Sequence, residues 1–218
     1  MSLRVIIADD HRIFREGLRT LLQIEPDTEV ISEAENGREV IKVVDELEPD
    51  LVIMDVAMPD MNGIEATRQI TSKNNNIKVL ALSMHADSRF VIQMLQAGAS
   101  GYILKDCAFE ELAQAMQSVR KNTIYLSPGV HTTTIRNYME NTSEDVSGVP
   151  DILLTPRERE ILQLIAEGKS TADIAELTDI SSKTVDTHRR KIMEKLQLYS
   201  VAELTRYAIK QGIVILEE

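Results

Sequence analysis

The stretch LVIMDVAMPDMNG, residues 51–63, joins a short apolar run to a polar loop that begins at Asp55. A short apolar run bounded by turn-forming residues is typical of a strand buried on both faces of a parallel sheet. Similar runs recur through the first 126 residues, and segments with helical spacing separate them. This alternation predicts a doubly wound α/β fold with five parallel strands, five helices and right-handed crossovers. The other apolar runs are Leu3–Ala8, Val30–Ile31 with Ala34, Ile77–Leu82 and Gly101–Leu104.

The pattern changes at Thr155, where helical signals replace strand signals. Thr155-Pro156-Arg157-Glu158 has the residues of a capping box, with proline at the first helical position. Four short helices are expected from here onward, and the tight turn between the second and third predicts a helix-turn-helix. The boundary signals are Thr155 and Gly168 for the first helix, Ser170 with Asp173 for the second, Ser181 or Ser182 and about Leu196 for the third, and Val201, Lys210 and Gly212 for the fourth.

A segment rich in turn-forming residues separates the two halves. Ser127–Pro150 is rich in Ser, Thr, Asn, Asp and Gly and has a proline near each end, which is typical of a linker. Ile135–Met139 could form a short helix inside it. We therefore expect an α/β domain over residues 1–126, a linker over 127–150 and a small all-α domain over 151–218.

The composition of this 218-residue chain excludes several classes of protein. Hydrophobic residues make up 43% and charged residues 27%, as in ordinary globular proteins. No apolar run approaches the roughly 20 residues that span a membrane, and the N-terminus lacks the features of a signal peptide. We therefore expect a cytoplasmic protein that makes no membrane contact. Cys107 is the only cysteine, which excludes an internal disulfide and a thiolate metal site.

Charge is distributed unevenly along the chain. The formal net charge is −11, which argues against nonspecific adhesion to nucleic acid over the whole surface. Residues 151–218 contribute only −2 of this, and residues 183–195 hold five bases against two acids. A basic helix on an acidic chain indicates a local nucleic-acid contact, although an ordinary solvated helix face would have the same charge.

Polar residues follow the predicted strands at the points where the strands end. Asp9-Asp10, Asp55, Ser83 and Lys105 come at the ends of four strands, and the carboxyl ends of parallel strands meet at one rim. Taken singly, these residues could be a helix cap, a turn residue, a second cap and a solvated lysine. Together they predict a site in which Mg²⁺ joins three carboxylates, one carboxylate accepts a phosphoryl group, and the hydroxyl and the ammonium hold its oxygens.

These residues, with Asp55-Val56-Ala57-Met58-Pro59-Asp60-Met61-Asn62-Gly63 and Gly101-Tyr102-Ile103-Leu104-Lys105, resemble the receiver domain of two-component response regulators over roughly residues 2–122. The resemblance implies a flavodoxin-like fold, with Asp55 as phosphoacceptor. It implies that Asp10, Asp55 and the Ala57 carbonyl bind Mg²⁺, assisted by Asp9 through water. Ser83 and Tyr102 would then form the switch pair, and Lys105 would hold phosphoryl oxygens. His11 and His85 are expected on the rim rather than as ligands.

The third helix of the C-terminal half has two distinct faces. Val185, Ile192 and Leu196 follow one apolar stripe, with His188 and Arg189 beside it. On the opposite face, Arg190 could donate to guanine, Asp186 could accept from cytosine, and the Thr187 methyl could meet a thymine methyl. Asp186 could instead pair with Arg189 or Arg190 within the helix. Residues better placed for phosphates are Lys183, Thr184, Lys191 and Lys195.

Four segments of this half resemble the LuxR-type DNA-binding domain of the NarL/FixJ subfamily over about residues 152–214. They are Thr155–Glu160, Glu167–Ser170, Asp173–Ala175 and Lys183–His188. The subfamily often has Asn where this chain has Thr171, and Gly where it has Gln197. The first difference affects a backbone or phosphate contact, and the second affects the end of the third helix. The resemblance implies that the fourth helix forms a dimer contact on DNA through Val201, Leu204 and Tyr207. Its apolar face could instead complete the domain core.

The two resemblances imply a transcription regulator that a sensor histidine kinase phosphorylates at Asp55. Phosphorylation would control dimerisation and binding to double-stranded DNA, expected at an inverted repeat. A phosphatase of the haloacid dehalogenase type would need a second Asp where this chain has Ala57, so only slow self-dephosphorylation and phosphorylation from small donors are expected. A degenerate receiver would lack its acceptor or Lys105, and both are present. We further hypothesise that the acidic receiver masks the basic helix at rest. If residues 148–218 alone and the intact unphosphorylated chain bound DNA with equal affinity, this masking would be excluded.

Overall fold

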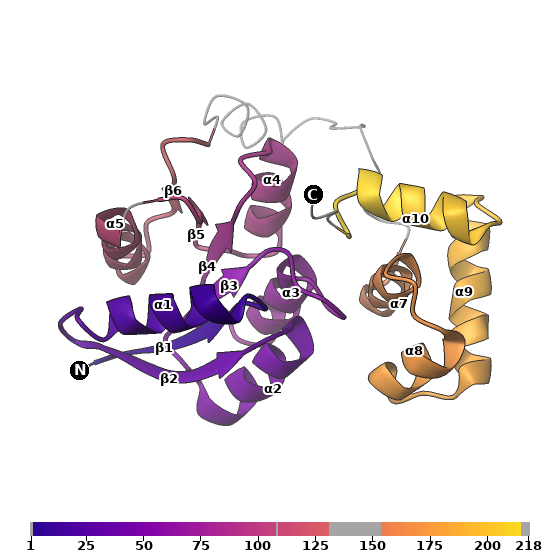
Figure 1. The fold of residues 1–218 in the computed structure, drawn as a ribbon, viewed down its shortest axis with the longest axis horizontal. Helices are drawn as coiled ribbons and strands as arrows, with labels where there is room; N and C mark the ends of the chain where they lie inside the picture. Colours follow the sequence, from indigo (N-terminus) through magenta and orange to yellow (C-terminus); the bar gives the residue numbers. More distant parts are fainter. Residues whose placement is uncertain (1, 108, 131–153, 215–218) are drawn as a thin grey trace. The chain divides into compact units, whose positions relative to one another are not determined.

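The computed structural model describes residues 2–107, 109–130 and 154–214. The chain forms two compact units (Figure 1). Residues 131–150 of the predicted linker, with the possible helix at Ile135–Met139, lie outside the described residues. The N-terminal unit contains β1 (Leu3–Ala8), α1 (Arg12–Leu22), β2 (Thr28–Ala34), α2 (Gly37–Leu47), β3 (Leu51–Asp55), α3 (Gly63–Lys73), β4 (Lys78–Ser83), α4 (Ser88–Gln96), β5 (Gly101–Leu104), α5 (Phe109–Arg120) and β6 (Tyr125–Leu126).

The strands form one parallel sheet in the order β2-β1-β3-β4-β5-β6. The doubly wound α/β fold is therefore confirmed, but the prediction of five strands is one short. The sixth strand has two residues, paired as Gly101 with Tyr125 and Tyr102 with Leu126. The backbone amide of Ser127 also donates to the carbonyl of Tyr102 (3.0 Å), so one further hydrogen bond joins the chain to β5 directly after β6 ends.

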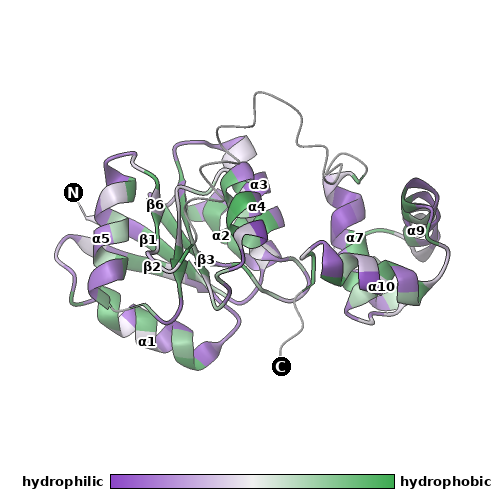
Figure 2. Cartoon of the chain, turned by 90° about the horizontal axis from the view of Figure 1, so that it is seen from above, coloured by the Kyte–Doolittle hydropathy of each residue, from purple (hydrophilic) through white to green (hydrophobic). Residues whose placement is uncertain are grey.

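Both faces of the sheet are covered by helices, as the short apolar runs predict. Val5 and Ile7 point into a core cluster with Leu18 and Leu22 of α1 and with Met116 of α5. Helices α2, α3 and α4 cover the opposite face (Figure 1). Figure 2 shows the strands as predominantly hydrophobic between helices whose outer sides are hydrophilic. This arrangement leaves the carboxyl ends of the strands as the open rim of the unit.

The C-terminal unit contains only helices among its described residues: α7 (Pro156–Ala166), α8 (Thr171–Thr178), α9 (Ser182–Leu196) and α10 (Val201–Lys210). Thr155 and Glu158 form the predicted capping box of α7, and Gly168 follows the helix with a φ of +83°. Ser181 is the residue that caps α9. A separate core of residues from all four helices, including Ile161, Ile174, Val185, Ile192 and Leu204, holds the unit together.

Among the described residues, no helix is both long enough and apolar enough to cross a bilayer.

Candidate functional site

The register of the sheet places the predicted site residues at one rim. Ala8 of β1 pairs with Met54 of β3, so Asp9 and Asp55, which follow them, lie side by side. Lys105 directly follows β5, and its amide donates to the Ser83 carbonyl at the end of β4 (2.8 Å). The structure thus brings together side chains that are far apart in the sequence, as expected for parallel strands.

Lys105 joins the two buried carboxylates of this rim. Its Nζ lies 2.7 Å from Asp55 Oδ2 and 2.8 Å from Asp9 Oδ2. The side chains of Asp9, Asp55 and Lys105 are 1%, 3% and 6% exposed, so the ion pairs are shielded from water. Buried charges are stable only when they are paired, and one ammonium cannot balance the carboxylates gathered here.

The pKa values of these groups reflect that imbalance. Burial raises the pKa of Asp55 to about 6, with Lys105 opposing the rise and Asp9 adding to it. Burial acts to lower the pKa of Lys105, but the attraction of Asp55 and Asp9 outweighs it and raises that pKa. An additional cation near Asp55 would favour its ionised form, which is the form that can act as a nucleophile.

The acidic cluster has the donor set of a divalent cation site. One ligand atom from each of Asp9, Asp10, His11 and Asp55 lies within 4.8 Å of the others. Asp10 Oδ1 is buried beside the His11 ring, 3.0 Å from its Nδ1. Three carboxylates against one lysine leave a net charge of −2, so the cluster fits a divalent ion bound by oxygen. The backbone of Ala57 lies beside this cluster, because its amide donates to Asp55 Oδ1 (3.3 Å).

The loop after Asp55 is fixed by close contacts of its backbone. The Gly63 amide donates to the Val56 carbonyl (3.0 Å), and Asn62 caps α3 by accepting from the Glu65 amide. A Cβ on Gly63 would lie only 1.9 Å from the Asp55 carbonyl oxygen. Only glycine permits this approach, which explains the glycine that ends the stretch at residues 51–63.

Ser83 and Tyr102, the expected switch pair, meet at the loop between β4 and α4. Ser83 is buried, and its Oγ accepts from the His85 amide (3.1 Å). The Tyr102 hydroxyl donates to the His85 carbonyl (2.7 Å), and its ring is fully buried. Burial raises the pKa of Tyr102, so the phenol keeps its proton as a donor.

Two residues of α1 that were not predicted as site residues contact Asp9 and Lys105 at the rim. Arg15 is 6% exposed and donates to the Asp9 carbonyl (2.5 Å), and it forms ion pairs with Glu33 (3.0 Å) and Glu35 (2.6 Å). The ring of Phe14 lies under Lys105 Nζ, 4.9 Å from the ring centroid. A signal for Arg15 was present in the sequence, since it shares the buried face of α1 with Leu18 and Leu22.

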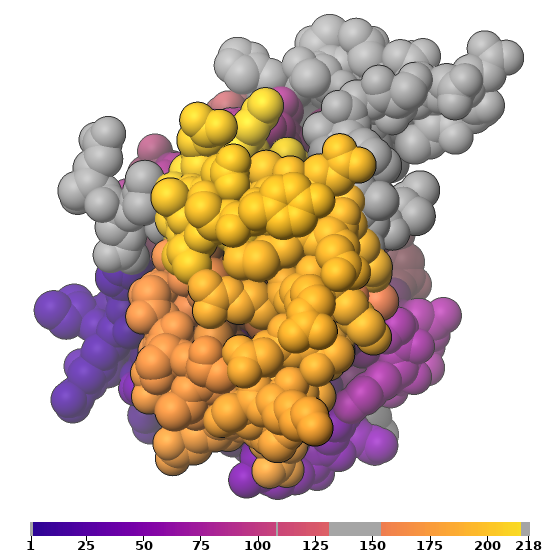
Figure 3. Space-filling model, turned by 90° about the vertical axis from the view of Figure 1, so that its right-hand side faces the viewer, coloured from indigo at the N-terminus to yellow at the C-terminus, as the bar shows by residue number. Residues whose placement is uncertain are grey.

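In the C-terminal unit, α9 exposes all seven residues predicted to contact DNA. Val185 and Ile192 are buried in the core, and His188 and Arg189 are half-buried beside them. The exposed side of α9 forms an outer wall of the unit (Figure 3). The exposed residues are Lys183, Thr184, Asp186, Thr187, Arg190, Lys191 and Lys195.

Contacts of individual α9 residues refine their expected roles. Asp186 and Arg190 are exposed, and among the described residues no ion pair joins Asp186 to Arg189 or Arg190. The Thr187 hydroxyl donates to the Lys183 carbonyl (2.9 Å). Lys195 Nζ instead lies 2.6 Å from Oε2 of Glu158, the buried capping residue of α7. Lys195 therefore ties α9 to α7 and is less available to a phosphate than the other lysines.

The residues named for a dimer contact on α10 differ in exposure. Leu204 is fully buried in the core of its own unit, so it has no surface to offer a second chain. Val201 is 41% exposed and Tyr207 is half-buried. The expectation that Leu204 completes the domain core therefore describes this residue, and a dimer contact would have to use its neighbours.

Comparison with known proteins identifies the family of each domain. Residues 5–117 match the family model of the response regulator receiver domain, and residues 153–208 match that of the bacterial regulatory proteins of the luxR family. The chain is 35% identical to the transcriptional regulatory protein DegU of Brevibacillus brevis, over 98% of this chain and 95% of that protein. It is 37% identical to the oxygen regulatory protein NreC of Staphylococcus carnosus, over 97% and 99%.

The structure is also similar to solved regulators. The structure of RcsB from Salmonella enterica serovar Typhimurium, bound to promoter rprA in the presence of the phosphomimetic BeF3⁻, matches with a TM-score of 0.58 and 27% identity, over 95% of this chain and 98% of that one. The chain therefore belongs to the two-component response regulators of the NarL/FixJ subfamily, transcription regulators in which a receiver domain is joined to a LuxR-type helix-turn-helix.

Proposed function

We propose that Asp55 accepts a phosphoryl group from the phosphohistidine of a sensor kinase, and that this modification controls pairing and DNA binding of the chain. A carboxylate oxygen of Asp55 attacks phosphorus, the phosphorus–nitrogen bond breaks, and the electron pair leaves with the imidazole. The product is an acyl phosphate. The observation that carries this assignment is that Lys105 Nζ lies within 2.8 Å of both Asp9 and Asp55 at the strand ends.

The surrounding residues have distinct roles in this proposal. Asp9, Asp10, Asp55 and the Ala57 carbonyl hold Mg²⁺, and that ion, when bound, offsets the charge of the incoming phosphoryl oxygens. Lys105 is already positioned at Asp55 and exchanges part of that contact for a phosphoryl oxygen. Catalysis here rests on positioning and charge, so the same site supports slow phosphorylation from small donors and slow self-dephosphorylation.

The signal leaves the site through the loop between β4 and α4. Ser83 Oγ accepts from the His85 amide and Tyr102 donates to the His85 carbonyl, so both switch residues hold the same loop residue. When Ser83 turns toward a phosphoryl oxygen, it gives up its contact with His85. We propose that this shifts the receiver between two arrangements and favours pairing of two chains, which raises the effective concentration of α9 helices at an inverted repeat.

Intact-mass spectrometry tests the acceptor directly. The full chain is incubated with Mg²⁺ and acetyl phosphate, and a single added phosphoryl group is expected on the wild type and none on Asp55→Asn. Asp60→Asn is the matched control, because Asp60 lies in the same loop at a φ of +64°, which asparagine tolerates. Phosphorylation that survives in Asp55→Asn and is lost in Asp60→Asn would refute the assignment.

A further inference from the structure

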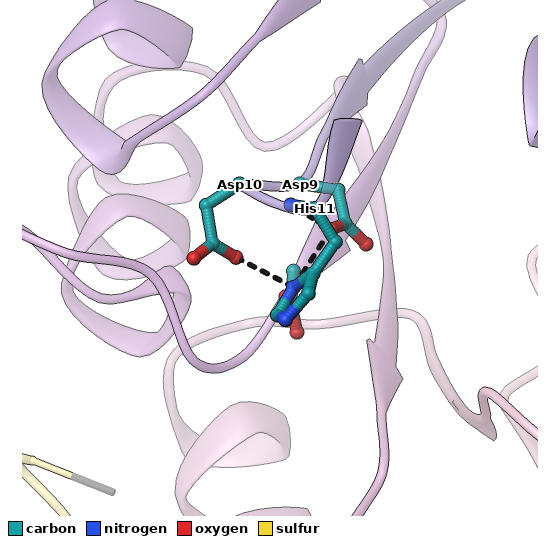
Figure 4. Close-up of side chains that lie close together, drawn as sticks. Asp9, Asp10 and His11 are labelled. Atoms are coloured by element: carbon teal, nitrogen blue, oxygen red, sulfur yellow. Dashed lines mark hydrogen bonds and ion pairs between the residues drawn. The ribbon is translucent and has the colours of Figure 1, made fainter. Parts of the chain in front are cut away.

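The imidazole of His11 points into the acidic cluster rather than away from it. His11 Nδ1 lies 3.0 Å from Asp10 Oδ1 and 3.4 Å from Asp9 Oδ1. Figure 4 shows the three side chains converging, with the ring nitrogen facing both carboxylates. Together with Asp55 they offer four ligand atoms within 4.8 Å of one another.

The distance between His11 Nδ1 and Asp10 Oδ1 is that of two neighbouring ligands on one ion. Nitrogen and oxygen ligands bind small divalent ions at about 2.1 Å. Two such ligands at a right angle are then about 3.0 Å apart, from the same bond length. The Nδ1–Oδ1 separation of 3.0 Å between His11 and Asp10 has this value. An ion could therefore bind both atoms without a rearrangement of the loop.

The net negative charge of the cluster also favours the binding of a cation. Asp10 Oδ1 is buried, and the His11 ring nitrogen lies 3.0 Å from it. A protonated His11 paired with the aspartates would still leave three carboxylates against two positive groups, His11 and Lys105. A divalent ion held by His11 through nitrogen leaves no net negative charge on the cluster and uses the buried oxygen.

We propose that His11 is a metal ligand, so that the site binds a first-row transition ion such as Ni²⁺, Co²⁺, Zn²⁺ or Mn²⁺ through imidazole nitrogen as well as carboxylate oxygen. This inference rests on the proposed metal site and revises the expectation that His11 stays on the rim. Mg²⁺ prefers oxygen ligands and keeps its waters, so it gains little from the ring. Transition ions accept imidazole readily, so His11 decides how strongly the site prefers them.

The full chain is titrated with Ni²⁺ and with Mg²⁺ by calorimetry, as wild type and as His11→Gln. The effect of His11 is the change in the ratio of the two affinities, because any carboxylate site binds Ni²⁺ more tightly than Mg²⁺. His11→Gln is expected to weaken Ni²⁺ binding by about tenfold or more and Mg²⁺ binding by less than about twofold. His188→Gln, which changes a histidine of α9 in the C-terminal unit, is expected to leave the ratio unchanged.

A second readout reports the ligand itself. In the ¹⁵N-labelled chain, Zn²⁺ is expected to shift the Nδ1 resonance of the His11 ring, assigned by its loss in His11→Gln, much further than Mg²⁺ does, because only Zn²⁺ bonds to the nitrogen. An unchanged Ni²⁺ affinity in His11→Gln, with no Zn²⁺ shift, would show that the contact is only an ion pair and would overturn the inference. Normal Mg²⁺ binding in that case leaves the proposed function standing, whereas absence of binding by either ion in the wild type would contradict both.

Discussion

Lys105 Nζ lies 4.9 Å from the centroid of the Phe14 ring, so an aromatic face supports the ammonium that joins Asp9 to Asp55. A ring at this distance attracts a cation through its quadrupole, and it also limits where a flexible lysine side chain can go. Phe14 thus acts as a positioning residue for Lys105 from a neighbouring helix, α1.

Replacing this ring should slow phosphorylation without removing the acceptor. In Phe14→Leu the apolar packing remains but the cation–π contact is lost, worth about 0.5–2 kcal/mol. We expect the rate of phosphorylation from acetyl phosphate to fall by a few-fold, measured by mass spectrometry over time. Phe14→Tyr keeps a ring and should retain the wild-type rate. Equal rates in Phe14→Leu and the wild type would show that Lys105 needs no such support.

The raised pKa of Asp55 predicts that its ionisation destabilises the receiver. The pKa of Asp55 is about 6 in the folded chain, against about 4 for an unfolded aspartate. The cost is therefore present in full above pH 6, diminishes as the pH falls through about 6, and is gone below about 4. Without metal, Asp55→Asn should raise the free energy of unfolding at neutral pH by on the order of 2 kcal/mol.

Urea unfolding of the receiver transition in chelator, compared between Asp55→Asn and the wild type across this pH range, measures the effect. The difference should shrink as the pH falls, and saturating Mg²⁺ should stabilise the wild type more than the variant. A difference that grows toward low pH would mean that Asp55 is stabilised as the anion, contrary to the imbalance of charge at the rim.

Gln197 ends α9 in a left-handed conformation with a φ of +55°. Glycine adopts this conformation without the steric cost that a Cβ brings. We expect Gln197→Gly to raise the free energy of unfolding of the C-terminal unit by about 0.5–1 kcal/mol, measured by thermal unfolding. Glu194→Gly, at an exposed position inside the same helix, is the control and should lower it by about 1 kcal/mol. Loss of stability in both variants would contradict the cap assignment.

Arg190 and Lys191 are neighbours on the exposed side of α9 but are expected to contribute differently to DNA binding. Arg190→Ala should relax specificity at one base position, at a cost of about 1–3 kcal/mol for the preferred base. Lys191→Ala should weaken binding to all sequences and reduce the salt dependence by about one ion. Affinities on a set of single-base operator variants at several salt concentrations separate the two effects. Identical behaviour of the two variants would contradict the division into base and phosphate contacts.

The main features of the fold could be predicted because each depends on local pattern. The apolar runs gave strands where helices could cover both faces, and the capping residues marked α7 and α8. The strand β6 was missed because it has two residues and leads into a segment rich in turn-forming residues. A pairing this short is fixed by its partner strand β5, through Tyr102 and Ser127, and not by its own sequence.

The candidate site likewise has a part that the sequence predicts and a part that it does not. The convergence of Asp9, Asp55 and Lys105 follows from strand ends in a parallel sheet, so sequence was sufficient. The contacts of Arg15 with the Asp9 carbonyl and of Lys195 with Glu158 depend on which long side chains reach across between elements. Sequence spacing does not determine such reach, and it also could not show that Leu204 is fully buried.

The most direct test of the account is DNA binding against a randomised duplex pool, with and without Mg²⁺ and acetyl phosphate, for the wild type and Asp55→Asn. We predict enrichment of an inverted repeat that strengthens on phosphorylation of the wild type and does not strengthen in Asp55→Asn. Enrichment that is the same under all conditions would contradict control of DNA binding by Asp55.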